Sequence, residues 1–285
     1  MTPVPLPHDL PQQIERALQE DIGGGDLTAG LIPQDARGRA TVITREAAIV
    51  CGLPYVEAVF ARLDGRVQID WHTSEGAPVA VDQMLFQIQG PARALLTGER
   101  TALNFLQLLS GTATATHAYV ERIEGTGCRL LDTRKTIPGL RTAQKYAVRV
   151  GGGHNHRIGL FDGILIKENH IMAAGSILQA VQAARAGGTG VPVEVEVENL
   201  EELRQAISAG SDIAMLDDFS LADMAEGVAV NRRAARPLKL EASGGVSLDT
   251  IRKIAETGVD FISVGSITKH VHAIDLSMRF DLKEI

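Results

Sequence analysis

The sequence lacks the features that mark secreted, membrane-spanning and nucleic-acid-binding proteins. Its two cysteines, Cys51 and Cys128, are far apart and have no metal-ligand spacing, which disfavours a disulfide framework. No apolar run approaches the roughly 18 residues that span a bilayer, and residues 1–10 do not resemble a signal peptide. A net charge of −7 argues against binding to a phosphate backbone. We therefore expect a cytoplasmic protein with no membrane and no nucleic acid among its partners.

The first part of the chain has the pattern of a small mixed domain. Asp9 and Pro11 favour a helix that starts there and runs to Gln19, where glycines follow. From Glu99 the spacing predicts one long helix, or two joined at Gly111. Between these helices lie three runs with alternating, strand-like character, at 40–50, 66–73 and 81–90.

Beyond residue 127 the pattern changes to repeated strand and helix units. Apolar runs occur at 128–133, 163–169, 191–199, 212–218, 238–245 and 260–266. Most are separated by helical patterns that close on a glycine, and such repeats form parallel strands. The fold class expected is α/β, a (β/α) barrel of about six to seven parallel strands with an N-terminal α/β sandwich domain. We place the N-terminal domain at 1–115 and the catalytic barrel at 116–272, with the tail at 273–285 a candidate to pack on the N-terminal domain.

Charges of opposite sign are segregated along the barrel part. Residues 129–170 hold eight Lys/Arg against three Asp/Glu, and residues 194–223 hold nine Asp/Glu against one Arg. Carboxylates and phosphates bind to converging cations, whereas Mg²⁺ binds to oxygen ligands. Because the C-terminal ends of barrel strands build the active site, these two groups of residues predict an enzyme site for a small polyanion and a divalent metal.

The run at 191–199 places alternating glutamates on one face of a strand. Glu194, Glu196 and Glu198 share that face, and in a parallel barrel the other face is covered by helices. Glutamates inside a barrel need Lys, Arg or a metal as partners. Asp217 and Asp218 end the next strand and could add oxygen ligands for Mg²⁺. Glu196 and Asp217 are therefore the candidate metal or ribose ligands.

Two further motifs bear on ligands. The last two strands end in Ser-Gly-Gly at 243–245 and Val-Gly-Ser at 264–266, which as a pair favour a phosphate site. A zinc site built from His154, His156 and His170 is the weaker interpretation, because Arg157 follows directly and repels a cation. His156 and Arg157 fit better as donors to a carboxylate.

Taken in order, these motifs resemble the quinolinate phosphoribosyltransferase family, also called nicotinate-nucleotide pyrophosphorylase (carboxylating). The resemblance covers nearly the whole chain and rests on the runs GDLT, ERTALN, DTRKT, GGGHNHR, KENH, EVEVEN, LDD, EASGG and VGS. It implies an enzyme of NAD biosynthesis with quinolinate and phosphoribosyl pyrophosphate as substrates and Mg²⁺ as cofactor. It also implies a homodimer with active sites shared between subunits, or a hexamer of such dimers.

The resemblance assigns roles to individual residues. Quinolinate is expected among Arg134, His156, Arg157 and Lys167, with Arg100 reaching in from the neighbouring subunit. Thr133 and Lys135 complete that cluster or contact the phosphoribosyl donor, and Lys135, Glu196 and Asp217 are the expected catalytic residues. The 5′-phosphate is expected at Ser243, Gly244, Gly245, Val264, Gly265 and Ser266. The family usually reads Leu-Asp-Asn where this chain has Leu216, Asp217 and Asp218.

Two other functions fit parts of the pattern. A related phosphoribosyltransferase, acting on nicotinate without decarboxylation or on another substrate, needs about one arginine for one carboxylate, and this chain offers more cations. A non-catalytic barrel that senses a phosphorylated metabolite is expected to lack the metal-side carboxylates, and Glu196 and Asp217 are both present.

Overall fold

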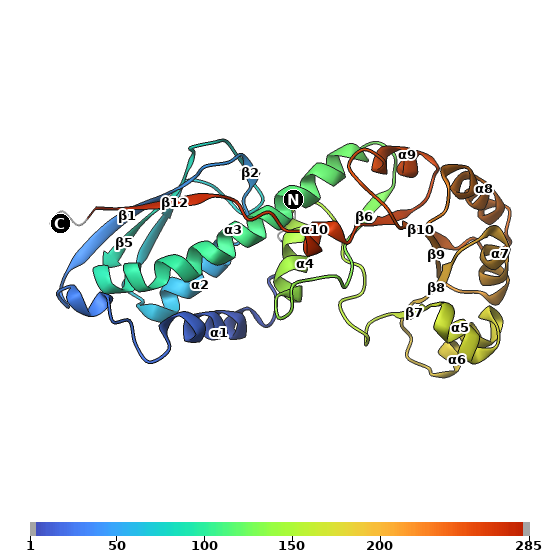
Figure 1. The fold of residues 1–285 in the computed structure, drawn as a ribbon, viewed down its shortest axis with the longest axis horizontal. Helices are drawn as coiled ribbons and strands as arrows, with labels where there is room; N and C mark the ends of the chain where they lie inside the picture. The colour runs from blue at the N-terminus through green and yellow to red at the C-terminus, as the bar shows by residue number, and fades with distance from the viewer. Residues whose placement is uncertain (1–3, 282–285) are drawn as a thin grey trace. The chain divides into compact units, whose positions relative to one another are not determined.

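The computed structural model describes residues 4–281, which form two compact units (Figure 1). Within that range, the first unit comprises residues 4–117, 136–152 and 267–281, and the second comprises 118–135 and 153–266. The division is therefore discontinuous along the chain. The single boundary between residues 115 and 116 stays a prediction.

An antiparallel sheet organises the first unit. Its strands lie in the order β12 (Leu276–Asp281), β1 (Arg37–Thr44), β5 (Met84–Pro91) and β3 (Gln68–Trp71). A second, two-stranded sheet pairs β2 (Ala48–Ile49) with β4 (Pro78–Val79). The longer helices of this unit are α1 (Leu10–Ile22), α2 (Leu53–Leu63), α3 (Ala92–Arg122) and α4 (Arg141–Val150), and the short ones are η1 (Ala29–Leu31) and α10 (Ser266–Lys269). Two helices cross the boundary between the units: the last turn of α3 and the first residue of α10 belong to the second unit.

The apolar residues of these elements form one core. Buried side chains of β1 and β5 pack with those of α1, α2, α3 and α4 in a single cluster. The strand-like runs of the sequence all contain strands, and the predicted first helix is confirmed as α1. The tail also takes part, because β12 pairs with β1 from Thr44 opposite Leu276 to Arg39 opposite Asp281. Residues 282–285 of the predicted tail lie outside the described residues.

Gly111 does not interrupt α3, which is one continuous helix. The glycine is needed for another reason: a Cβ atom at this position would overlap the carbonyl oxygen of His272. The chain therefore uses glycine in a helix interior, at a cost of about 1 kcal/mol in helix propensity, to let the segment before β12 lie close to the helix.

The second unit is built on six parallel strands, as predicted for a (β/α) barrel. Their order is β6 (Arg129–Leu131), β11 (Phe261–Ser263), β10 (Lys239–Ser243), β9 (Ile213–Asp217), β8 (Val193–Val197) and β7 (Ile164–Ile166). A seventh strand is reduced to one bridge, at which His154 lies parallel to Leu131 on the free edge of β6. The expected number of six to seven strands agrees with this arrangement.

Helices cover the outer side of these strands (Figure 1). They are α5 (Glu168–Ala174), α6 (Ile177–Ala186), α7 (Leu200–Ala209), α8 (Leu221–Arg232) and α9 (Ile251–Glu256). One expectation was wrong in detail: the strand at 163–169 ends at Ile166, and Lys167 is the N-cap of α5, so the KENH motif starts a helix. No helix within residues 4–281 is long and apolar enough to cross a membrane.

Replacing Gly111 by alanine is expected to lower the free energy of unfolding by roughly 2–3 kcal/mol, because the added methyl group overlaps a backbone oxygen that cannot move alone. Urea denaturation followed by circular dichroism measures the change. Gly65→Ala is the matched control, since a Cβ atom there meets nothing within 4 Å, and its effect is expected to stay within about 0.5 kcal/mol. Equal midpoints for the two variants would contradict the close approach at Gly111.

Candidate active site

The C-terminal ends of the six parallel strands surround a cavity of about 420 Å³. Each strand contributes either its last residues or the loop that follows, as expected for a barrel of this type. The lining residues are Thr133, Arg134, Lys135, His156, Arg157, Leu165, Lys167, Glu196, Met215, Asp217, Glu241, Ser243 and Ser263. All the expected quinolinate-side residues of the second unit, and both candidate metal ligands, are therefore brought together.

One side of the cavity is cationic. The guanidinium group of Arg157 is hydrogen-bonded to the backbone: its Nη1 donates to the carbonyl oxygen of Gly163 at 3.2 Å. Burial and the nearby positive charge of Arg134 both lower the pKa of Arg157 below its usual range. Two guanidinium groups that repel each other in one cavity favour an anion between them, because a carboxylate offers two oxygens to a planar guanidinium.

The other side is acidic. Glu196 forms an ion pair with Lys167, and Asp217 lies near both Glu196 and Asp218. Burial, followed by the negative charges of Glu196 and Asp218, raises the pKa of Asp217 above its ordinary value, although Lys167 and a hydrogen bond with Ser243 act in the opposite direction. A carboxyl group whose pKa is raised by neighbouring negative charges is a place where a cation binds favourably.

The glycine loops follow the two strands as the sequence predicted, after β10 and β11. Gly244 has a positive φ of 95°, and a Cβ atom there would overlap the carboxylate of Asp218. A Cβ atom on Gly265 would lie 3.0 Å from the side chain of Lys135, so this loop packs against the DTRKT segment. The hydroxyl oxygen of Ser266 is buried without a hydrogen-bond partner among residues 4–281.

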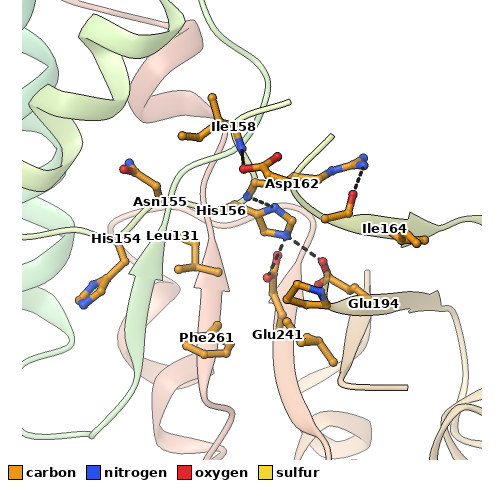
Figure 2. A pocket seen from close by; sticks show the side chains of 14 residues that line it. Leu131, His154, Asn155, His156, Ile158, Asp162, Ile164, Glu194, Glu241 and Phe261 are labelled. Carbon is orange, nitrogen blue, oxygen red and sulfur yellow. Dashed lines mark hydrogen bonds and ion pairs between the residues drawn. The ribbon is translucent and has the colours of Figure 1, made fainter. Parts of the chain in front are cut away.

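His156 is placed differently from the other expected ligands. Its Nε2 lies 2.9 Å from Glu194 Oε2 and 3.4 Å from Glu241 Oε2. Figure 2 marks both contacts with dashed lines. The backbone N–H of His156 donates to Asp132 Oδ1 at 2.9 Å, and Asn155 Nδ2 donates to Asp132 Oδ2 at 2.7 Å. The carboxylates that His156 faces are therefore those of the protein itself.

Sequence reasoning missed Asp132 and Glu241 as parts of the site. Glu241 could have been found by strand alternation, because it stands two residues before Ser243 and so points to the same face of β10. Asp132 carries no such signal, since its role depends on the bridge between Leu131 and His154, which are distant in sequence.

The remaining expected residues lie apart from this cavity lining. Arg100 is an exposed residue of α3 in the first unit. His154 and His170 do not join His156 in a metal-type cluster among the described residues, where His156 instead groups with Glu194 and Glu241. His170 Nδ1 accepts the backbone N–H of Lys167 at 3.0 Å and so caps α5.

Comparison with known families accounts for both units. The model of the quinolinate phosphoribosyl transferase C-terminal domain matches residues 112–279, and that of the N-terminal domain matches residues 26–110. The chain belongs to the quinolinate phosphoribosyl transferase family. The family resemblance suggested by the sequence motifs is thereby confirmed.

Individual members of the family are similar over almost their full length. The chain is 43% identical to a probable nicotinate-nucleotide pyrophosphorylase [carboxylating] of Bacillus subtilis, covering 92% of this chain and 90% of that one. It is 41% identical to the Mycobacterium leprae nicotinate-nucleotide pyrophosphorylase [carboxylating], with coverage of 93% and 95%. The solved structure of the Francisella tularensis nicotinate-nucleotide pyrophosphorylase matches with a TM-score of 0.92 at 50% identity, covering 98% of both chains.

Asp218, where this chain departs from the usual family pattern, influences its neighbour Asp217. Asp218→Asn is expected to lower the pKa of Asp217, because it removes one of the negative charges that raise it. Asparagine also tolerates the positive φ of 52° at this position. The pKa is measured by ¹³C NMR titration of the aspartate carboxyl carbons, with Asp217→Asn used to assign the signal. An unchanged Asp217 midpoint would contradict the electrostatic coupling.

Proposed function

We propose that this protein transfers the phosphoribosyl group of phosphoribosyl pyrophosphate to quinolinate, with decarboxylation. The products are nicotinate mononucleotide, CO₂ and pyrophosphate, and the reaction belongs to de novo NAD biosynthesis. The observation that carries the proposal is one cavity in which Arg134, Arg157 and Lys167 face Glu196 and Asp217. Membership of the family supports the same reaction.

Quinolinate, a pyridine ring with two neighbouring carboxylates, fits the cationic side. Arg134, Arg157 and Lys167 supply more positive charge than one carboxylate requires, which favours the dicarboxylate over nicotinate. Binding would divide Lys167 between its partner Glu196 and a substrate carboxylate. His156 lines the same cavity, and we propose that its ring edge contacts the pyridine, because both ring nitrogens already have partners in the protein.

The reaction itself demands orientation and charge rather than a protein nucleophile. Departure of pyrophosphate leaves oxocarbenium character on the ribose, and we propose that the carboxylate of Glu196 stabilises it. We propose that Lys135 and Thr133, which line the same cavity, bind the pyrophosphate end. The ring nitrogen then forms the bond to C1′. The resulting positive charge on the ring draws the electron pair of the breaking C2–carboxylate bond, so that CO₂ leaves and C2 takes up a proton.

The acidic side fits Mg²⁺. Asp217 and Glu196 present carboxylate oxygens to one cavity, where burial and then the negative charges of Glu196 and Asp218 raise the pKa of Asp217. We propose that Glu196 and Asp217 hold the ion. When bound, Mg²⁺ would offset the charge of the pyrophosphate.

We propose that the 5′-phosphate of the donor binds to the loops after β10 and β11, at Ser243, Gly244, Gly245, Val264, Gly265 and Ser266.

We also propose a cytoplasmic homodimer, or a hexamer of dimers, in which Arg100 of one subunit enters the site of its partner. The cationic cavity lies in the second unit and Arg100 in the first.

Release of labelled CO₂ from quinolinate that carries the label in its 2-carboxylate tests the reaction. Release is expected only when phosphoribosyl pyrophosphate and Mg²⁺ are both present, and each is omitted in turn as a control. Consumption of nicotinate without release from quinolinate would instead support the non-decarboxylating transferase. No turnover of either substrate would support the non-catalytic sensor.

Mixing two inactive variants tests whether the site is shared. Arg100→Ala and Arg134→Ala are each expected to lose nearly all activity. If Arg100 acts across a two-fold interface, random mixing makes half of the dimers hybrid, each with one intact site, so roughly a quarter of wild-type activity should return. Mixtures that stay inactive, although exchange of subunits is shown by native mass spectrometry, would contradict sharing.

A further inference from the structure

The loop at 157–163 carries Arg157 at its first position and leads into β7. Two apolar side chains at its tip are largely exposed, Leu160 by 73% and Phe161 by 79%. Because segments with few buried apolar contacts open easily, packing does little to fix the path of this loop. Its hydrogen bonds must do so instead.

One carboxylate holds the first turn of the loop. The backbone N–H of Ile158 donates to Asp162 Oδ2 at 2.8 Å (Figure 2). The next N–H, that of Gly159, donates to Asp162 Oδ1 at 2.9 Å. Hydrogen bonds from backbone N–H groups to an ionised carboxylate are shorter and stronger than those to a neutral acceptor. Both oxygens of Asp162 therefore close the loop on itself.

The side chain of Arg157 is attached to the other end of the same loop. Its Nη1 donates to the carbonyl oxygen of Gly163 at 3.2 Å. A Cβ atom on Gly163 would lie 3.3 Å from Arg157 Cβ, so little space separates this side chain from the end of the loop. Because Gly163 follows Asp162 directly, a turn that opened at Asp162 would move the acceptor that holds the guanidinium group.

Asp162 and Arg157 differ in the cavities that they line. Asp162 lines a second cavity of about 430 Å³, which also includes the first residues of β7, β9 and β11. Arg157 lines both this cavity and the active-site cavity. Asp162 is thus placed to act on a substrate in the active-site cavity through Arg157 rather than by direct contact.

The charge of Asp162 would by itself disfavour an anionic substrate. Its negative charge lies close to Arg157, as does that of Glu194, and both act against the repulsion from Arg134. A carboxylate beside a cation weakens the attraction of that cation for a second anion. An acidic residue at this position is therefore unfavourable for binding an anion unless it has another task, such as holding the loop.

We propose that Asp162 is a positioning residue for quinolinate: by accepting the amides of Ile158 and Gly159 it closes the loop at 157–163 and fixes the guanidinium group of Arg157 in the active-site cavity. This rests on the proposed function, in which quinolinate binds at the cationic side that includes Arg157. Phosphoribosyl pyrophosphate is proposed to bind to other residues, so its affinity should not depend on Asp162.

Steady-state kinetics of the full-length protein tests the role of Asp162. Asp162→Ala is expected to raise the KM for quinolinate by about tenfold, the effect of losing a hydrogen bond to a charged group. A smaller change in kcat and little change in the KM for phosphoribosyl pyrophosphate are expected. A lower KM for quinolinate would show that only the charge matters and would overturn the proposal, as would an equal rise in both KM values.

Two further variants separate geometry from charge. Asp162→Asn removes the same charge but keeps one oxygen for one of the two amides, so its KM for quinolinate should lie between those of wild type and Asp162→Ala. Equal KM values in the two variants would contradict a positioning role. Glu201→Gln is the matched control, because it removes one negative charge from an exposed position on α7, and it should leave the kinetics unchanged.

Hydrogen exchange measured by mass spectrometry tests the loop itself. The peptide that covers 157–163 is expected to exchange faster in Asp162→Ala than in wild type, while the rest of the second unit stays unchanged. Equal protection of this peptide would contradict Asp162 as the support of the loop. Faster exchange throughout the second unit would indicate general destabilisation and would overturn the specific role.

Failure of this inference can be told apart from failure of the proposed function. Wild-type protein that neither binds quinolinate in calorimetry nor releases CO₂ from it would refute the proposed function and the inference with it. Normal wild-type turnover, together with an unchanged KM for quinolinate in Asp162→Ala, would refute the role of Asp162 alone.

Discussion

The structure depends on placing charged side chains inside a parallel barrel. Helices cover the outer face of the strands, so every second residue of β8, β9 and β10 points to the interior, where water does not compensate charge. Basic side chains lie against the buried carboxyl groups: Lys167 faces Glu196, and His156 faces Glu194 and Glu241. The same arrangement brings the like charges of Arg134 and Arg157 close together, and those of Asp217, Glu196 and Asp218, which is what an anionic substrate and a cation require.

Two layers can be distinguished along β8 and β10. In the upper layer, near the strand ends, Glu196 and Ser243 line the cavity and are accessible to a ligand. In the lower layer, Glu194 and Glu241 are buried and face His156. His156 lies beside Arg157, whose side chain lines the cavity and whose backbone N–H donates to His156 Nδ1. Residues two positions apart on one strand, such as Glu194 and Glu196 on β8, thus have different surroundings.

Much of this could be predicted from sequence, because local patterns determine it. The alternating valines and glutamates at 193–198 predicted β8 and the direction of Glu194 and Glu196, and each of the six apolar runs contains one of the six parallel strands. What could not be predicted depends on contacts between distant segments. The contacts of His156 follow from the path of the chain after the bridge between Leu131 and His154, and the need for glycine at 111 follows from His272. Alternation showed that Glu194 needed a partner but not that the partner would be a histidine.

The pairing of β12 with β1 joins the two ends of the sequence. The sheet of the first unit contains β1 and β12, and β12 is synthesised only after the whole second unit, which lies between them in the sequence. Until then the outer edge of β1 has no partner, and an unpaired strand edge is a template for association with other chains. At about 5–20 residues per second, that interval is on the order of ten seconds or more. The sheet of the first unit is therefore completed only after the whole second unit has been synthesised.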